Sequence, residues 1–286
     1  MTQTNTMDAT EAQQRLAEAR AWWSTKITDV RPNYIGIRGY PIEQLIGHLR
    51  YSEMVWLLLR GELPNEKQAQ LLDVALVSGV DHGLHAPSGA ISRMAITCGL
   101  PVNGAMASAI NVLDDSHGGA GQQCMSLLYD IDRRLEGRNV DESVVVTAID
   151  RYVEQHGKII GGFGHRFHDV DPRAVRILAL VRQARDEGTI AGRFADIAIA
   201  VEQTLTSRKR VPIPLNVDGA TAVIFCELGF APELGRGIYI LSRAAGILAH
   251  AWEQIQEGRT NKGPMPPTID YTYAGPAKRD FVKPVS

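Results

Sequence analysis

The stretch that decides the fold is Gly161-Gly162-Phe163-Gly164-His165-Arg166, which is followed closely by Asp171-Pro172-Arg173-Ala174. Glycine lets a backbone pass close to a ligand, and loop residues held on a rigid scaffold often carry the chemistry of a protein. The stretch presents one histidine and two arginines from turns. Arginine pairs well with carboxylates, so these residues suit a substrate that carries carboxylates beside a carbonyl group.

Two further segments have the same character, with a polar residue placed next to glycine. They are Asp115-Ser116-His117-Gly118-Gly119-Ala120 and Leu215-Asn216-Val217-Asp218-Gly219-Ala220. Histidine and aspartate are the usual groups for moving protons in catalysis. Together with His165, the residues His117 and Asp218 therefore form a candidate acid–base set.

Hydrophobic periodicity is helical along most of the chain and predicts an all-α fold. Helices are expected to begin at Pro64-Asn65, at Asp141-Glu142 and at Asp171-Pro172, because these residues are typical of helix starts. Apolar positions are expected to face the core in the first and third of these helices: Leu71, Leu72, Ala75 and Val77, then Val175, Leu178, Ala179 and Val181. Residues 232–256 are apolar on much of their circumference and predict a buried helix.

Composition excludes several classes of protein. The chain has 286 residues, of which 44% are hydrophobic, and its net charge of −2 gives no basic surface for nucleic acid. No apolar run approaches the roughly 20 residues that cross a bilayer, and the polar N-terminus lacks a signal core. Three widely spaced cysteines, Cys98, Cys124 and Cys226, fit reduced thiols in the cytoplasm better than disulfides.

The ordered motifs resemble those of the citrate synthase superfamily. They are HGGA at 117–120, GFGHR at 162–166 with DPRA at 171–174, NVDG at 216–219, and Ser242-Arg243-Ala244. The resemblance runs from about Arg38 to about Pro266. It implies a citrate-synthase-like, all-α fold with a large domain from residues 1–154 and 235–286 and a small domain from 155–234. The large domain includes a proline-rich tail from about residue 263, the active site lies in the cleft, and the chain forms a homodimer or a higher homo-oligomer.

The same resemblance implies a role for each matching residue. Asp218 is expected to be the catalytic base, His117 to stabilise an enolate and His165 to polarise the carbonyl of a 2-oxo acid. The remaining implied residues bind substrate or coenzyme A: His82, Arg173, Arg243 and Arg259 for the oxo acid, and Gly161, Gly162, Gly164 and Arg166 for coenzyme A. No cofactor is implied beyond coenzyme A as part of the substrate.

Each role has a structural alternative. Asp218 could cap a helix that begins at Gly219, and His117 and His165 could be hydrogen-bonded loop histidines. Arg243 lies in an apolar helix, so its charge needs an anionic partner, which is either the substrate or a buried acidic side chain. The pairs His82-x-x-His85 and His165-x-x-His168 lack the Glu of HExxH and any cysteine pair, so the sequence predicts no metal site.

Departures from the synthase pattern decide the predicted reaction. Gly219 stands where synthases carry a bulky residue, Gly121-Gln122 follows HGGA, and residues 81–90 read DHGLHAPSGA. These features resemble citryl-CoA lyases, including the lyase module of ATP-citrate lyase, although that module lacks a histidine matching His117. We therefore expect cleavage of citryl-CoA to acetyl-CoA and oxaloacetate. The alternatives are a citrate or methylcitrate synthase, and a non-catalytic homologue that binds coenzyme A and regulates a partner.

Overall fold

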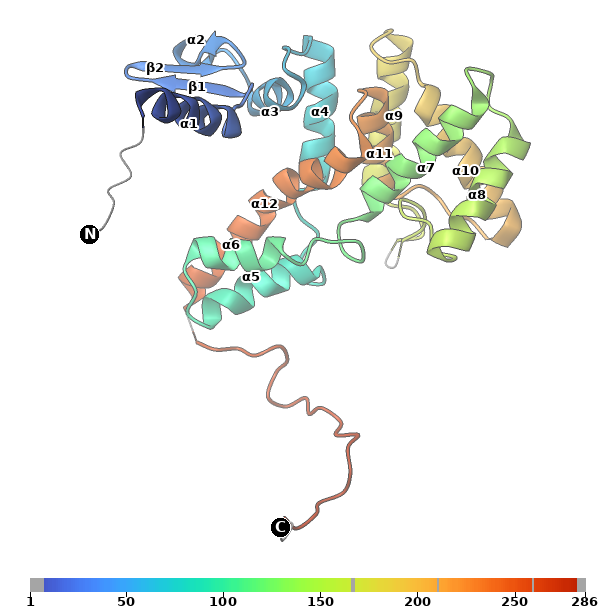
Figure 1. Ribbon diagram of the computed structural model, residues 1–286. Coiled ribbons are helices and arrows are strands. Elements are labelled where there is room, and N and C mark those ends of the chain that lie inside the picture. Colours follow the sequence, from blue (N-terminus) through green and yellow to red (C-terminus); the bar gives the residue numbers. More distant parts are fainter. Residues whose placement is uncertain (1–7, 166–167, 210, 259, 282–286) are drawn as a thin grey trace.

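The computed structural model describes residues 8–165, 168–209, 211–258 and 260–281. The fold is all-α, as predicted, with one small sheet near the N-terminus (Figure 1). In chain order the elements are α1 Ala9–Trp22, β1 Thr28–Arg31, β2 Tyr34–Ile37, β3 Tyr40–Pro41, α2 Ile42–Leu45, α3 Tyr51–Arg60, α4 Glu66–Ser78, α5 Pro87–Thr97, α6 Val102–Ile110, α7 Ala120–Leu135, α8 Glu142–His156, α9 Pro172–Asp186, α10 Arg193–Lys209, α11 Val217–Glu227 and α12 Pro232–Glu257.

The three predicted helix starts are confirmed. Asn65 caps α4: its side chain accepts a hydrogen bond from the backbone N–H of Gln68, and the Gln68 side chain accepts one from the backbone N–H of Asn65. Asp141 caps α8, and Asp171 caps α9 with proline in the first turn. These side chains satisfy backbone N–H groups that have no partner inside the helix, which is why the sequence marks the starts so clearly.

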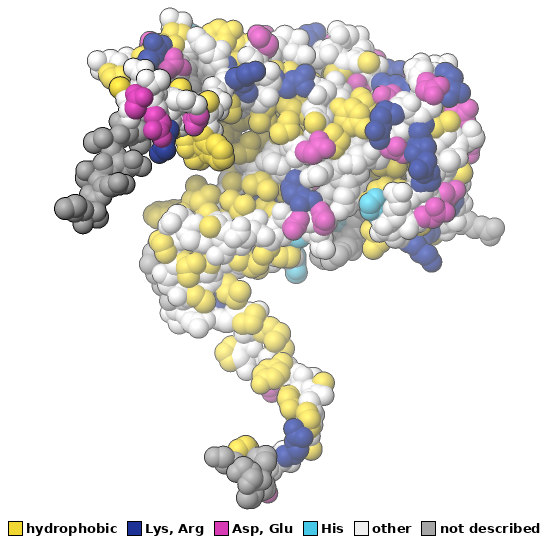
Figure 2. Space-filling model, in the orientation of Figure 1, with side chains coloured by type: hydrophobic (Ala, Val, Ile, Leu, Met, Phe, Trp, Pro, Cys, Tyr) yellow, Lys and Arg dark blue, Asp and Glu magenta, His cyan; other side chains and the backbone are white. Residues whose placement is uncertain are grey.

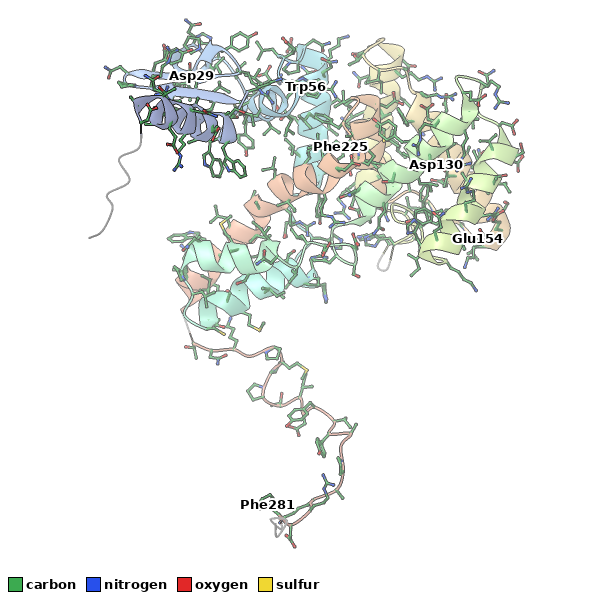
Figure 3. The ribbon with its side chains drawn as sticks, in the orientation of Figure 1. Asp29, Trp56, Asp130, Glu154, Phe225 and Phe281 are labelled. Carbon is green, nitrogen blue, oxygen red and sulfur yellow. The ribbon has the colours of Figure 1, made fainter. Side chains whose placement is uncertain are left out.

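The main core lies where α11 packs between α4, α7, α9 and α10. In Figure 3, Phe225 of α11 and Trp56 of α3 are labelled in this region; each packs a ring against that of Phe230, with centroids 6.3 and 5.2 Å apart. Three predicted core positions are wrong, since Val77, Val175 and Ala179 are all exposed. Val77 is 70% exposed and Val175 is 56% exposed, because the buried stripes of α4 and α9 are narrower than the apolar residues suggest.

The N-terminal segment forms a small unit that the helical periodicity did not predict. Strands β1, β2 and β3 pair in order as an antiparallel sheet, with Thr28 opposite Ile37 and Gly36 opposite Pro41. Helix α1 runs beside this sheet in Figure 1, yet it buries no residue, and Trp22 and Trp23 are more than 80% exposed.

Helix α12 is a single 26-residue helix that crosses the molecule. It contacts α4, α7 and α11 at the body, whereas α5 and α6 pack along its other part to form an arm. The expectation of a fully buried helix is only partly met, since Leu241, Leu248 and Trp252 are 40 to 56% exposed. Figure 2 shows hydrophobic side chains facing the hollow between this arm and the N-terminal unit.

The chain after α12 is extended and leads away from the arm, with Phe281 labelled near its end in Figure 3. Its proline-rich sequence excludes a regular helix, as expected. Within the described ranges, none of the helices combines the length and the apolar character that a membrane span requires.

Candidate active site

The glycine-rich segment 161–164 pairs with residues 214–216 from a distant part of the chain. Gly164 N donates to the carbonyl of Pro214 at 2.8 Å, and Asn216 N donates to that of Gly162 at 3.0 Å. The amide side chain of Asn216 adds a bond of 2.7 Å to the carbonyl of Gly164. This pairing joins the loop that carries His165 to the start of α11, which carries Asp218.

The loop and α11 approach so closely that only glycine fits between them. A Cβ on Gly219 would lie 2.2 Å from the carbonyl oxygen of Gly162, and Gly162 itself has a φ of +89°. A Cβ on Gly161 would meet the backbone of Ala120 at 2.8 Å, at the start of α7. Gly219 therefore has a packing reason that is independent of the reaction catalysed.

Asp218 does not cap α11, so that alternative is wrong. The helix begins at Val217, and the side chain of Asn216 accepts hydrogen bonds from the backbone N–H groups of Asp218 and Gly219. Asp218 is half-buried and lines a small pocket; desolvation raises the pKa of its carboxyl, and Arg173 and Arg243 oppose that rise. A carboxyl with a raised pKa is suited to exchanging a proton near neutral pH.

Asp171 forms hydrogen bonds with three parts of the site. It is 1% exposed, caps α9, and accepts a hydrogen bond of 3.0 Å from the backbone N–H of Val217. The Arg173 guanidinium donates to it through Nε and Nη2 at 3.0 and 2.9 Å. Arg173 thus reaches the site already paired with a carboxylate, which sequence reasoning did not foresee.

His117 lies in a turn held from two sides. Arg236 of α12 forms ion pairs with Asp114 and Asp115, which precede it. The backbone N–H of Ser88 donates to His117 Nε2 at 3.3 Å, and the Ser88 hydroxyl lies 3.1 Å from the same nitrogen. Since a backbone N–H can only donate, Nε2 is the accepting nitrogen, and the ring proton is on Nδ1. Burial lowers the pKa of His117, which favours this neutral form.

One face of α12 lines the site along several turns. Its residues 236, 239, 243, 246 and 250 lie three or four positions apart, so they share that face. They contact residues 79–81 and 114–115: Arg236 pairs with Asp114 and Asp115, Arg243 donates to Gly79 O, Gly246 lies close to Val80 O, and His250 contacts Asp81. A small pocket of about 10 Å³, room for about one water molecule, lies beside this face and is lined by Asp218, Thr221 and Tyr239, among others.

The guanidinium of Arg243 is buried beside a backbone carbonyl and an aromatic ring. The residue is 4% exposed, its Nε donates to Gly79 O at 2.8 Å, and its guanidinium stands 5.2 Å from the ring centre of Tyr239. Among the described residues no carboxylate lies within ion-pair distance of it. Its charge acts on the Asp218 carboxyl, so both partners expected for this charge, a substrate and a buried acidic side chain, stay open.

Three histidines gather at the edge of the site. The ring centres of His82 and His165 are 5.4 Å apart, and His168 lies 4.5 Å from His165 and 6.1 Å from His82. Burial lowers the pKa of both His82 and His165, with Arg173 adding to the effect. His85 is exposed and is not a member of this cluster, so the grouping differs from the HxxH pairs in the sequence.

The structure brings together most of the predicted site residues. The loop glycines 161, 162 and 164 lie beside α7 and α11. Six predicted residues are near enough for their charges to act on one another: His82, His117, His165, Arg173, Asp218 and Arg243. Arg166 and Arg259, predicted to bind coenzyme A and the oxo acid, lie outside the described residues. Sequence reasoning missed Ser88, Asp171, Tyr239 and His168 as parts of the site. Only Asp171, as a helix cap, and His168, in an HxxH pair, gave any signal.

The fold and the site together define an α-helical protein whose candidate site combines acid–base groups with arginines. Comparison with known proteins gives the family: the model for the C-terminal domain of citrate synthase matches residues 18–70 and 65–263, and the chain belongs to the citrate synthase family. The citrate synthase of Haloferax volcanii is 34% identical over 74% of this chain and 53% of its own length, so the chain spans about half of the curated relatives it matches.

Solved structures extend the comparison. The citryl-CoA lyase of Hydrogenobacter thermophilus is 31% identical, with a TM-score of 0.78, over 91% of this chain and 97% of that chain. The ATP citrate lyase of Methanothrix soehngenii has a TM-score of 0.74 at 18% identity, over 94% of this chain and 45% of its own, and supports the fold alone. The family resemblance and the all-α fold expected from the sequence are thereby confirmed.

Proposed function

We propose that the chain cleaves citryl-CoA to acetyl-CoA and oxaloacetate. The observation that carries the proposal is the meeting of Asp218, His165 and Arg173 through the pairing of residues 162–164 with 214–216. It is supported by the likeness to the citryl-CoA lyase of Hydrogenobacter thermophilus, which extends over 97% of that chain. The family match alone supports chemistry between an acyl-CoA and a 2-oxo acid in either direction.

The cleavage requires two groups that transfer protons and start in different protonation states. His165, whose pKa is lowered by burial, is neutral and accepts the proton of the citryl hydroxyl as the carbon–carbon bond breaks. The electrons of that bond pass to the thioester, which becomes an enolate. Asp218, whose pKa is raised by burial, delivers a proton to the enolate carbon and forms acetyl-CoA.

Three groups stabilise charge during this reaction. The Nδ1–H of His117 is free of the Ser88 contacts, which both involve Nε2, and it donates to the enolate oxygen. Arg243 holds a substrate carboxylate, and Arg173 does so while it remains anchored to Asp171. The coenzyme A chain approaches along glycines 161, 162 and 164, with His82 at the oxo-acid end. The two-domain division, a homodimeric state and a cytoplasmic location stay predictions.

The alternative function is synthesis of citrate or methylcitrate, in which Asp218 removes the proton from the acyl-CoA. It is favoured by the His117–Ser88 contact, which keeps a neutral histidine where the lyase module of ATP-citrate lyase lacks one, and by the citrate synthase relatives. Gly219 does not argue against it, because the carbonyl of Gly162 accounts for that glycine.

The test is to incubate purified protein with citryl-CoA and identify the products by mass spectrometry. Acetyl-CoA with oxaloacetate is the expected result, whereas citrate with free coenzyme A would indicate a synthase. Asp218→Asn should lower turnover by about a thousandfold or more if the carboxyl transfers the proton. Glu154→Gln, an exposed change on α8 labelled in Figure 3, is the control. Near-normal turnover of Asp218→Asn would overturn the assignment, and coenzyme A binding without any turnover would favour a regulatory homologue.

A further inference from the structure

The imidazoles of His82, His165 and His168 converge from two separate segments of the chain. One ring nitrogen from each lies within 4.8 Å of the other two. The planes of His82 and His168 are nearly perpendicular, at 88°, and those of His165 and His168 differ by 40°. Inclined rings at these separations also occur in ordinary aromatic packing, so the convergence of the three ring nitrogens is the observation that points to a metal ion.

The spacing of these nitrogens is close to what a metal ion needs. Zinc binds histidine nitrogen at 2.0–2.1 Å, so three nitrogens in a tetrahedral site are about 3.4 Å apart. Modest side-chain rotations close the remaining difference. His168 is exposed while His82 and His165 are partly buried, so an ion can enter from solvent and keep one open position.

Nearby charges do not exclude a cation. Arg173 and Arg243 both act on His82, but Arg173 is paired with the Asp171 carboxylate, and Asp218 lies near both arginines. Asp81, adjacent to His82, pairs with His250. Two arginines and the paired carboxylates of Asp171 and Asp81 leave the local charge close to balanced, in contrast to a site lined by arginine alone.

We propose that His82, His165 and His168 form a reversible site for a divalent transition metal ion of the zinc class, and that the ion excludes the oxo-acid end of the substrate. Imidazole suits Zn²⁺, Co²⁺ and Ni²⁺. The part of the proposal in which the ion excludes the substrate rests on the proposed function, because His82 and His165 are proposed to contact substrate and His168 is not. Binding is expected to be reversible because three histidines supply one ligand fewer than a closed, four-ligand structural zinc site.

The direct test measures metal binding without substrate. Untagged protein is treated with EDTA, dialysed and titrated with Co²⁺ by visible absorption, and then with Zn²⁺ against a coloured chelator. One equivalent per chain is expected. His168→Gln should weaken binding by at least about tenfold, as the loss of a metal-supporting group does. His85→Gln removes an exposed histidine outside the cluster and should leave binding unchanged.

Absence of binding, or equal binding by wild type and His168→Gln, would overturn the site. Circular dichroism checks that His168→Gln is folded. Competition between the ion and the substrate is measured by citryl-CoA kinetics. Zn²⁺ should raise KM for wild type and raise it far less for His168→Gln. Inhibition that is the same in both proteins would overturn the proposal that the ion excludes the substrate. If citryl-CoA is not turned over at all, the proposed function fails, while the Co²⁺ titration still decides the metal site.

Discussion

Two segments without regular helix contrast sharply: the loop at residues 161–164 and the tail at residues 263–281. Both are rich in residues that break helices. The loop is bound to residues 214–216 by backbone bonds of 2.8 and 3.0 Å, and Phe163 within it is 8% exposed. In the tail, Tyr271, Tyr273 and Phe281 are 70 to 88% exposed.

The difference shows that a partner segment, and not composition, decides whether such a stretch builds a site. The loop meets a distant segment that matches its hydrogen-bonding groups. The backbone bonds reported for the tail are local, such as that from Ile269 to Pro266 at 2.9 Å. Exposed aromatic groups are typical of surfaces that another molecule covers, and the homo-oligomer stays a prediction.

The largest expected effect comes from forcing the loop and α11 apart. Gly219→Ala places a Cβ against the carbonyl of Gly162, where the backbone must move, and should lower the free energy of unfolding by about 3 kcal/mol or more. Gly237→Ala is the matched control, since this exposed glycine of α12 has open space around it and should gain up to about 1 kcal/mol. Urea unfolding measures both. Equal stability of the two variants would show that the close contact does not constrain the loop.

Asp171→Asn should cost about 2 kcal/mol, because a buried group that bonds to Arg173 and to the N–H of Val217 loses its charge. The pKa of Asp171 is lowered; burial alone would raise it, but the bonds from Arg173 and Val217 outweigh that effect. The folded pKa is thus below the unfolded value of about 3.9, so the stabilisation is fully present above about pH 4 to 5 and is lost as pH falls through the folded pKa.

The measurement is urea unfolding of wild type and Asp171→Asn across this pH range. The gap between the two proteins should close in acid. A gap that stays constant from neutral pH to pH 3 would contradict the role given to the carboxylate.

Asn216 offers a smaller effect with a built-in comparison. Asn216→Ala removes both the cap of α11 and the donor to Gly164 O, and should cost about 1 to 2 kcal/mol. Asn216→Asp keeps an acceptor for the cap but loses the donor, so it should be intermediate. Turnover should fall with both, since Asp218 is positioned by the same turn. If Asn216→Asp matched Asn216→Ala in thermal unfolding, the cap would not be the stabilising part.

Removal of the tail should have the smallest effect. A chain that ends at Lys262 should unfold within about 0.5 kcal/mol of the full chain at low protein concentration, because the tail side chains are exposed. Sedimentation at increasing concentration sharpens the comparison: weaker self-association of the short chain would show that the tail contacts a second copy. A marked loss of stability in the dilute protein would contradict the exposed arrangement.

Much of the fold could be predicted because helix caps and apolar periodicity are local properties. Asn65, Asp141 and Asp171 mark helix starts through bonds to residues two or three positions away. Which apolar residues are buried depends on neighbouring helices, so Val77 and Val175 were placed in the core and lie at the surface. The short strands β1–β3 carry too few residues for a clear alternating pattern.

The candidate site shows the same limit. Residues next to glycine were found because their motifs are contiguous. The partners that orient them come from elsewhere: Ser88 reaches His117 from α5, and Tyr239 stacks on Arg243 within α12. His82 joins His168 only through folding, so sequence spacing could not reveal the three-histidine cluster. Gly219 resembles the lyase pattern, but the neighbouring carbonyl of Gly162 leaves no room for a side chain there. Gly219 is therefore weaker evidence for a lyase than the sequence suggested.

Helix α12 restricts where the chain can gain or lose residues. Its contacts with residues 79–81 and 114–115 recur every three or four positions along one continuous helix. Insertion of one residue near Arg236 would turn everything beyond it by about 100° and move Arg243, Gly246 and His250 off the shared face together. Insertions of seven residues nearly restore that face. Lineages of this chain should therefore tolerate length changes in the loops and in the tail, while α12 keeps its phase.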